Sequence, residues 1–596
     1  MEIYALIMAW GLELGKDMIM VKKVMQTIIH EDYLIGMDSF LEWAEPGVGF
    51  DARKGVEDGV QGGNAGLFPF LRGAKGICRY HCSQEARRGW DTLKLYVEIK
   101  DLEGVIAQVK AEANFTVRGN DQSKTKFGRK SFPSDFVFGV GSASYQYEGA
   151  VQEGGRSPSI WDKFSRIPGK IVDKSNGDVA NDQYHRYKED IKLLVDMGVD
   201  SYRFSISWSR IFPKGRGTVN KKGIAYYNNL IDELLKHGIE PFVTIFHWDL
   251  PQALQDEYGG FLSEKIVKDF SSYAITCFEA FGDRVKKWVT INELFIISFF
   301  GYGDGSHAPG RCTNCTAGDS ATEPYIVSHN LLLAHSAAVK IYRETYKEKQ
   351  KGSIGITLVA HWFIPYSNSF NDQKATRRVL DFYLGWFMNP LTRGKYPNTM
   401  QALVGDRLPH FTKAQSRLVK DSFDFIGLNY YTTFYAIHNN STSNAAPIDF
   451  TADSRVTTTS EKNNIPIGAT AGSSWLHVYP RGIRALLNYM KRRYNNPLIY
   501  ITENGIDEIN NASMPLKESL NDTWRIDYTS KHLANINLAI RDGCNVRGYF
   551  GWTFMDDYEW GSGYSVRFGF YFVDRNRNLT RYPKASAHWF HNFLSH

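Results

Sequence analysis

The chain of 596 residues is 43% hydrophobic and 14% aromatic, which is enough apolar material for one large core or for several domains. Its 70 basic and 64 acidic residues give a formal net charge of +6 without a Lys/Arg block, which argues against nucleic acid as a partner. No apolar run approaches the roughly 18 residues that a membrane span requires, so we expect a soluble globular protein without a membrane partner.

Residues 1–126 show no sustained hydrophobic period and contain no chemical motif, although a helix is expected around residues 97–113. The apolar run IYALIMAWGL follows no basic residue and precedes no small-residue cleavage site, so it is a weak targeting signal. We expect an N-terminal extension of unknown role, either an appendage or mistranslated upstream sequence. An independent functional domain is the alternative.

Asn-x-Ser/Thr sequons occur at Asn114, Asn314, Asn439, Asn440, Asn511, Asn521 and Asn578. Chance supplies a few sequons in a chain of this length, so this number only tilts the prediction toward a glycoprotein on a secretory route. The vacuole, the apoplast and the endoplasmic reticulum all fit that route.

Cysteines are too few for a disulfide framework. Cys312 and Cys315 form a C-x-x-C in the polar stretch PGRCTNCTAGDS, with no second C-x-x-C or H-x-H cluster nearby. We expect either a small loop disulfide or two free thiols there, and no metal site.

From Phe132 onward, short β-branched or aromatic runs alternate with helical patterns. Strands are predicted at residues 136–144, 201–207, 241–248, 288–294, 352–360, 423–431, 498–505 and 546–554. Helical stretches lie between them, such as YYNNLIDELLKHG, which ends in a glycine stop signal. Alternating strands and helices pair in parallel, so eight such units predict an α/β fold, a (β/α)₈ TIM barrel with long βα loops, over residues 127–596.

Barrel enzymes build their sites at the carboxyl ends of the strands, so the residues there are the candidates. In chain order they are Gln146, Arg203, His247, Trp248, Asn292, Glu293, Asn429, Tyr431, Glu503, Trp552, Glu559 and Trp560. Amide, imidazole and carboxylate groups suit a ligand with many hydroxyls, and indole faces suit the C–H-rich face of a sugar ring. The fifth strand end is ordinary and offers only His361 and Trp362.

Two carboxylates, Glu293 after the fourth strand and Glu503 at the seventh, each stand beside an Asn at the end of an apolar strand. Either one alone could be a solvated loop charge or a salt-bridge partner. Two carboxylates on opposing strands of one barrel mouth, however, suit glycoside cleavage, with one as proton donor and the other as nucleophile or base.

Several long motifs follow one another in order: SASYQYEGA, YRFSISWSRIFP, FHWDLPQAL, TINE, GLNYYT, YITENG and DDYEWGSGYSVRFGFYFVD. With them, residues 131–596 resemble plant β-glucosidases of glycoside hydrolase family 1. The resemblance implies retention of configuration through a covalent glycosyl-enzyme, with Glu503 as nucleophile and Glu293 as acid/base. It also implies that Arg203 and the Tyr431 hydroxyl keep Glu503 ionised, while partial burial and the charge of Glu503 keep Glu293 protonated.

By the same resemblance, glucose would be bound by Gln146, His247, Trp248, Asn292, Asn429, Trp552, Glu559, Trp560 and Phe568. The aglycone would contact Trp475, Leu294, Phe295 and Phe299. Glu559 would repel a phosphate and Glu293 stands where thioglucosidases carry Gln, which together imply unphosphorylated O-β-glucosides. An apolar aglycone slot selects by shape, so we expect a terpenoid, phenolic, alkaloid or cyanogenic aglycone. No cofactor or metal is expected, and the oligomeric state is left open.

Three features depart from the family pattern. Leu294 stands where a proline usually follows the acid/base, and so removes a restraint on the backbone beside Glu293. Cys312 and Cys315 are closer in sequence than the bridged cysteines of plant relatives, and Asp557 stands where Asn is common. Two alternatives remain, a transglucosidase that uses the same intermediate and a catalytically silent sugar-binding protein on the same fold.

Overall fold

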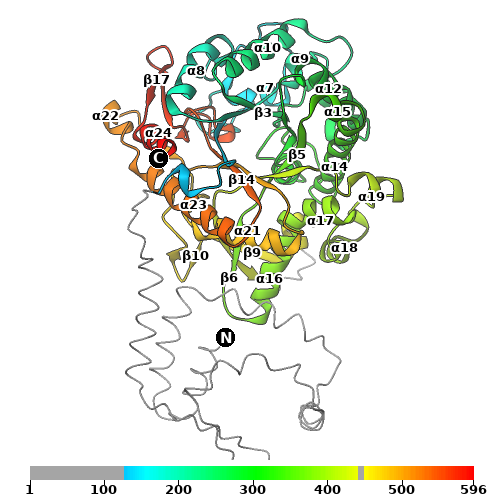
Figure 1. Cartoon of the computed structure of the whole chain (residues 1–596). Helices are drawn as coiled ribbons and strands as arrows, with labels where there is room; N and C mark the ends of the chain where they lie inside the picture. Colours follow the sequence, from blue (N-terminus) through cyan, green and yellow to red (C-terminus); the bar gives the residue numbers. More distant parts are fainter. Residues whose placement is uncertain (1–126, 440–448) are drawn as a thin grey trace, which may run out of the picture. The chain divides into compact units, whose positions relative to one another are not determined.

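The computed structural model describes residues 127–439 and 449–596, whose arrangement Figure 1 shows. The expectations for residues 1–126, which include the helix at 97–113 and the sequon at Asn114, lie outside these residues, as does the sequon at Asn440. Among the described helices, none combines the length and the apolar character that crossing a membrane would need.

Eight parallel strands close into a barrel in which strands consecutive in the chain are neighbours. They are β1 (Val137–Gly141), β2 (Ser201–Ser205), β3 (Glu240–Phe246), β4 (Lys287–Asn292), β5 (Ser353–Val359), β7 (Phe425–Asn429), β12 (Ile499–Asn504) and β14 (Val546–Gly551). Every predicted strand of the barrel is present, which confirms the (β/α)₈ fold class.

The main helices follow the strands in sequence and surround the barrel (Figure 1). They are α8 (Gln183–Met197), α10 (Lys221–Lys236), α12 (Lys265–Phe281), α14 (Glu323–Ile341), α16 (Phe370–Leu380), α17 (Trp386–Arg393), α19 (Lys413–Val419), α21 (Arg481–Arg493), α23 (Thr523–Arg541) and α24 (Ala585–Ser595). Helix α10 begins where the Asn220 side chain accepts the N–H of Lys222, and the chain leaves it through Gly238 at φ 74°. The start and stop of this predicted helix thus follow from capping chemistry.

Aromatic side chains fill part of the barrel interior. The ring of Phe242 lies 5.6 Å from that of Phe425, 5.4 Å from that of Tyr500 and 4.8 Å from that of Phe550. Room for them comes from small residues, since a Cβ on Gly139 would lie 2.5 Å from the Phe550 ring. Because the interior is packed and is no pore, a ligand site has to form at an end of the barrel.

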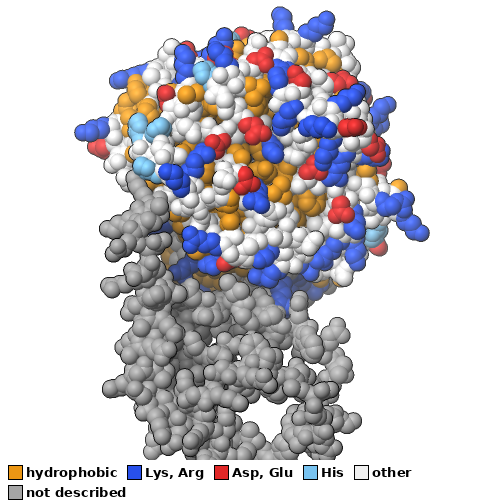
Figure 2. Space-filling view, in the orientation of Figure 1, with side chains coloured by type: hydrophobic (Ala, Val, Ile, Leu, Met, Phe, Trp, Pro, Cys, Tyr) orange, Lys and Arg blue, Asp and Glu red, His pale blue; other side chains and the backbone are white. Residues whose placement is uncertain are grey.

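Long βα loops carry the remaining elements. Helix α13 (Leu294–Tyr302) follows β4 directly, and β6 (Trp362–Pro365), β8 (Thr433–His438) and β9 (Val456–Thr459) form a small sheet beyond β5 and β7. Two short pairs follow, β13 (Glu508–Ile509) with β15 (Val566–Arg567) and β16 (Tyr571–Asp574) with β17 (Thr580–Pro583). Figure 2 shows acidic and basic side chains interspersed over the visible face.

Candidate active site

The candidate side chains converge at the carboxyl end of the barrel. Arg203 lies in β2, Asn292 ends β4, Asn429 ends β7 and Glu503 lies near the end of β12. Arg203, Asn292 and Asn429 are 0% exposed and Glu503 is 3% exposed. Because water hardly reaches these groups, charges and hydrogen bonds among them act at a low local dielectric.

Glu293 occupies a sharp turn between β4 and α13. Its backbone adopts the left-handed conformation, with φ 52°, which is uncommon for a residue other than glycine. Its N–H donates to the carbonyl oxygen of Thr357 in β5 at 2.9 Å, and Asn429 Nδ2 donates to its Oε1 at 2.7 Å. The turn and these bonds aim the carboxyl across the barrel mouth toward β7.

Leu294 is the first residue of α13, a position at which helices accept proline readily. The turn at Glu293 and its bond to Thr357 are present with leucine in that place. Leu294 was predicted to contact the aglycone, but its side chain is 0% exposed. It therefore packs beneath the site and has no surface that a ligand could contact.

Glu503 accepts stronger hydrogen bonds than Glu293 does. Arg203 Nη1 donates to its Oε1 at 2.7 Å, and the hydroxyl of Tyr431 donates to its Oε2 at 2.7 Å. Arg203 also donates from Nη2 to Asn292 Oδ1 at 2.6 Å, so one guanidinium orients both groups. Charge-assisted bonds of this kind favour the ionised carboxylate.

Burial raises the pKa of both carboxyls. For Glu293 the charge of Glu503 adds to burial, and the pKa lies well above its usual range. For Glu503 the charge of Arg203 and the Tyr431 hydrogen bond oppose burial, yet the pKa remains raised. The bonds from Arg203 and Tyr431 thus offset part of the desolvation of Glu503 and favour its ionised form. The pKa of Glu293 is raised further than that of Glu503, so Glu503 ionises before Glu293.

The hydrogen bonds of Asn292 determine which ring nitrogen of His247 carries the proton. Since Asn292 Oδ1 accepts from Arg203, its Nδ2 is the atom that donates to His247 Nε2 at 3.1 Å. Burial, together with the charge of Arg203, lowers the pKa of His247 well below its usual range, so the ring is neutral. A neutral imidazole that accepts at Nε2 carries its proton on Nδ1. That N–H is buried and has no partner among the described residues, which leaves it free to donate to a ligand.

Gln146 and Glu559 form a second polar pair. Gln146 Nε2 donates to Glu559 Oε2 at 3.2 Å, while Gln146 Oε1 is buried and without a partner in the described part of the chain. Burial and the nearby charge of Asp557 raise the pKa of Glu559 well above its usual range. Asp557 is itself buried, with a raised pKa and an unpartnered Oδ2 within the same described ranges.

Indole rings frame these polar groups. The rings of Trp552 and Trp560 stack on His247 at 5.9 and 5.8 Å, and the ring of Phe568 lies 6.1 Å from that of Tyr431. Trp248 differs from expectation, because its indole N–H already donates to the carbonyl oxygen of Asn292 at 3.0 Å. Only the ring of Trp248 remains to contact a ligand.

Asn429 also differs from expectation. Its Nδ2 is committed to Glu293, and its Oδ1 accepts from Thr502 Oγ1 at 2.7 Å. Asn429 therefore positions the carboxyl of Glu293, and its capacity to bond a sugar directly is largely used. Thr502 escaped the sequence analysis, although it stands directly before Glu503 in YITENG.

Gly141 was also missed, and a Cβ there would lie 2.9 Å from the Trp552 ring. A glycine inside a strand is the signal that could have drawn attention to this close approach.

Aromatic residues from several loops form the opposite wall. Phe295 stacks on Tyr383 at 3.9 Å between ring centroids and lies 5.6 Å from Phe299. Trp475 is 42% exposed, and its ring lies 5.8 Å from that of Tyr431. Tyr383 was not predicted, because it follows no strand and its segment DFYLGWF reads as plain helix. Its pKa is raised by burial and by the charge of Glu293, which places it in the field of that carboxyl.

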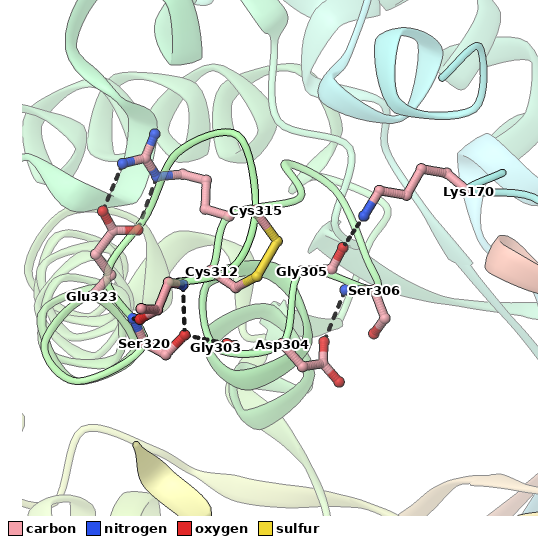
Figure 3. Close-up of a disulfide and its surroundings, with 11 residues drawn as sticks. Lys170, Gly303, Asp304, Gly305, Ser306, Cys312, Cys315, Ser320 and Glu323 are labelled. Carbon is pink, nitrogen blue, oxygen red and sulfur yellow. Dashed lines mark hydrogen bonds and ion pairs between the residues drawn. A yellow bond between two sulfur atoms is a disulfide. The ribbon is translucent and has the colours of Figure 1, made fainter. Parts of the chain in front are cut away.

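A disulfide joins Cys312 to Cys315 in the loop between α13 and α14 (Figure 3). Lys170 Nζ, from the loop after β1, donates to the carbonyl oxygen of Gly305 in the same loop at 2.8 Å. Of the two alternatives that the sequence left open, the structure has the bonded one. The hydrogen bond from Lys170 attaches this loop to the loop after β1.

The chain is similar to known proteins in both sequence and structure. The sequence model of "Glycosyl hydrolase family 1" matches residues 128–596. "Beta-glucosidase 12" of Oryza sativa subsp. indica is 57% identical over 483 residues, which cover 80% of this chain and 94% of that protein. The "Furostanol glycoside 26-O-beta-glucosidase" of Hellenia speciosa is 56% identical over 479 residues, covering 79% and 84%. A rice β-glucosidase mutant, solved in a covalent complex with glucose, superposes with a TM-score of 0.78 at 52% identity, covering 79% of this chain and 100% of that one.

Proposed function

The chain belongs to glycosyl hydrolase family 1 and is a β-glucosidase, and we propose that it hydrolyses O-β-D-glucosides of hydrophobic plant metabolites through a covalent glucosyl-enzyme. The observation that carries this proposal is the unequal bonding of its two carboxyls. Glu503 receives bonds from a guanidinium and a phenol, whereas Glu293 receives one from an amide. Environments that separate two pKa values in this way assign the acid and the nucleophile.

In the first step the ionised Glu503 attacks the anomeric carbon, and the bond from that carbon to the aglycone oxygen breaks. Glu293 gives its proton to this oxygen, so the aglycone leaves as a neutral alcohol and Glu293 becomes a carboxylate. Arg203 keeps Glu503 directed at the carbon through the bond at 2.7 Å.

In the second step water replaces the aglycone. The ester of Glu503 carries no charge, so the repulsion that raised the pKa of Glu293 has gone and Glu293 can take a proton from water. The hydroxide attacks the anomeric carbon from the face that the aglycone left, Glu503 departs as a carboxylate, and β-glucose is released. The covalent glucose complex of the rice relative supports this two-step route.

Glucose would be held by buried polar groups that have no partner in the described part of the chain. His247 Nδ1–H is a buried donor and Gln146 Oε1 a buried acceptor, and neither has a partner among the described residues. Glu559 stands beside Gln146 and adds a further acceptor for sugar hydroxyls. A site built on such groups penalises the loss of a hydroxyl strongly, so we propose discrimination for glucose over sugars that lack one.

The aglycone would lie against Trp475 and the stack of Phe295, Tyr383 and Phe299. This wall is aromatic, and the named substrate of the Hellenia speciosa relative is a furostanol glycoside, which supports a hydrophobic aglycone. Terpenoid, phenolic, alkaloid and cyanogenic aglycones all meet that description.

The test is to follow hydrolysis of an aryl β-glucoside by proton NMR, with and without an added alcohol. We expect β-glucose to appear first and α-glucose only by later mutarotation. α-Glucose as the first product would overturn retention, binding without turnover would favour the silent sugar-binding protein, and alkyl glucoside as the main product would favour a transglucosidase.

A further inference from the structure

His361 stands between β5 and β6, at the strand end that looked ordinary in the sequence. Its ring lies 5.1 Å from that of Tyr383, 5.3 Å from that of Phe434 and 6.4 Å from that of Trp475. Two of these neighbours belong to the aglycone wall, so the imidazole lies within a mainly aromatic surface.

The imidazole has unused bonding capacity. Neither ring nitrogen makes a hydrogen bond within residues 127–439 and 449–596, and Nδ1 is buried. Burial also lowers the pKa of His361 to about 3, so the ring is neutral and offers one donor and one acceptor. Buried polar groups without partners are rare in folded proteins, and each requires an explanation.

His361 lies where the leaving group could use this hydrogen-bonding capacity. Tyr383 stacks on Phe295 in the turn after Glu293 and feels the charge of the Glu293 carboxyl. His361 packs on the same Tyr383 and faces the exposed Trp475. An aglycone that leaves from Glu293 toward Trp475 would therefore pass His361.

We propose that His361 is a specificity-determining residue that hydrogen-bonds a hydroxyl on the aglycone, and that the substrates are glucosides of phenolic aglycones that carry a further free hydroxyl. A hydroxyl both donates and accepts, so it can pair with Nε2 of the neutral imidazole in either tautomer, and an aromatic ring fits the wall of Phe295, Tyr383 and Trp475. This inference rests on the proposed function and narrows its aglycone class.

The test compares phenyl β-glucoside with its ortho-, meta- and para-hydroxy derivatives for the wild type and two variants, His361→Phe and His361→Gln. We expect the wild type to prefer at least one hydroxy isomer, and His361→Phe to lower kcat/KM for that isomer about tenfold. The same variant should leave phenyl β-glucoside within about twofold, and His361→Gln should retain part of the preference. Differences in leaving-group acidity cancel, because each variant is compared with the wild type on the same substrate.

Equal loss on all four substrates, or no loss on any, would overturn the role of His361. Tyr383→Phe removes the neighbouring phenol and keeps the ring. If it abolishes the preference while His361→Phe does not, the hydroxyl contact belongs to Tyr383 and the inference fails. Inhibition by gluconolactone reports whether the glucose side is intact in each variant. A wild type that hydrolyses no β-glucoside of any aglycone would instead overturn the proposed function.

Discussion

Asn429 donates from Nδ2 to Oε1 of Glu293 at 2.7 Å, while its Oδ1 accepts from Thr502 at 2.7 Å. Thr502 directly precedes Glu503 in β12. The amide of Asn429 therefore links the strand that carries Glu503 to the carboxyl of Glu293. A hydrogen bond to a carboxylate favours its charged form, and Asn429 accordingly opposes the burial that raises the pKa of Glu293.

Asn429→Ala should therefore raise the pKa of Glu293 further. The alkaline limb of the pH profile of kcat/KM, which follows loss of the Glu293 proton, should move to higher pH. Because Glu293 also loses a positioning contact, kcat/KM at its optimum should fall about tenfold. Thr502→Val, which removes the hydroxyl that donates to the Asn429 amide, should shift the limb in the same direction by a smaller amount. A shift to lower pH would contradict this account.

Glu293→Gln should separate the two chemical steps. A substrate with an acidic leaving group, such as a dinitrophenyl β-glucoside, needs no proton, so its first step should proceed while water attack becomes slow. The glucosyl-enzyme should then accumulate on Glu503, where mass spectrometry of peptides can detect it. Azide, which needs no general base, should restore turnover and give β-glucosyl azide. An α-azide product, or labelling of a carboxyl other than Glu503, would refute the assigned roles.

The same substitution should stabilise the folded protein at neutral pH. An unfolded glutamate ionises near 4.5, whereas in the folded state the pKa of Glu293 lies well above that value. As pH rises above about 4.5, the unfolded chain releases a proton that folded Glu293 keeps, so the folded state loses stability until the raised pKa is passed. Glutamine does not titrate and avoids that loss.

The melting temperature of Glu293→Gln should accordingly exceed that of the wild type at pH 7 by about 1–2 °C, and the difference should vanish near pH 4. The exposed Glu348, whose side chain makes no hydrogen bond within the described ranges, provides the matched control substitution, Glu348→Gln. A lower melting temperature for Glu293→Gln at pH 7 would show that the carboxyl stabilises the fold.

Sequence patterns predicted the barrel because each strand is a short apolar run that ends in polar residues. The same periodicity brought Glu293, Glu503 and Arg203 together, since the ends of parallel strands meet. Tyr383 and the aromatic partners of His361 could not be found in this way. They come from long loops, whose course depends on packing that no local period encodes. No sequence pattern indicated that the side-chain N–H groups of Asn429 and Trp248 donate to other groups of the protein.

A protein that begins at Lys124 should fold and retain the kcat/KM of the full chain within about twofold, because every proposed site residue lies beyond it. Such a protein keeps Phe127, whose ring packs on Phe593 of α24 at 5.5 Å. One that begins at Ser134 also loses Phe132, which is 6% exposed and packs on Phe138 at 5.3 Å, so its melting temperature should fall. Inactivity of the longer protein would show that residues 1–123 contribute to catalysis.

Trp475→Ala should weaken binding of the aglycone and leave binding of the glucose unit unchanged. Its indole is 42% exposed and lies near Tyr431 and His361, at 5.8 and 6.4 Å between rings, where a bulky leaving group would stack on it. Methyl β-glucoside is too small to reach that ring, so its KM should change less than about twofold. For an aromatic glucoside the lost stacking should raise KM about tenfold, since an aromatic pair contributes roughly 0.5–1.5 kcal/mol beyond its buried area. Steady-state kinetics on the two substrates, with gluconolactone inhibition as a control for the glucose side, distinguish these effects. An equal rise in KM for both, or a wild-type preference for long cello-oligosaccharides, would show that the exposed indole serves a glucan chain or the fold, and that the aglycone lies elsewhere.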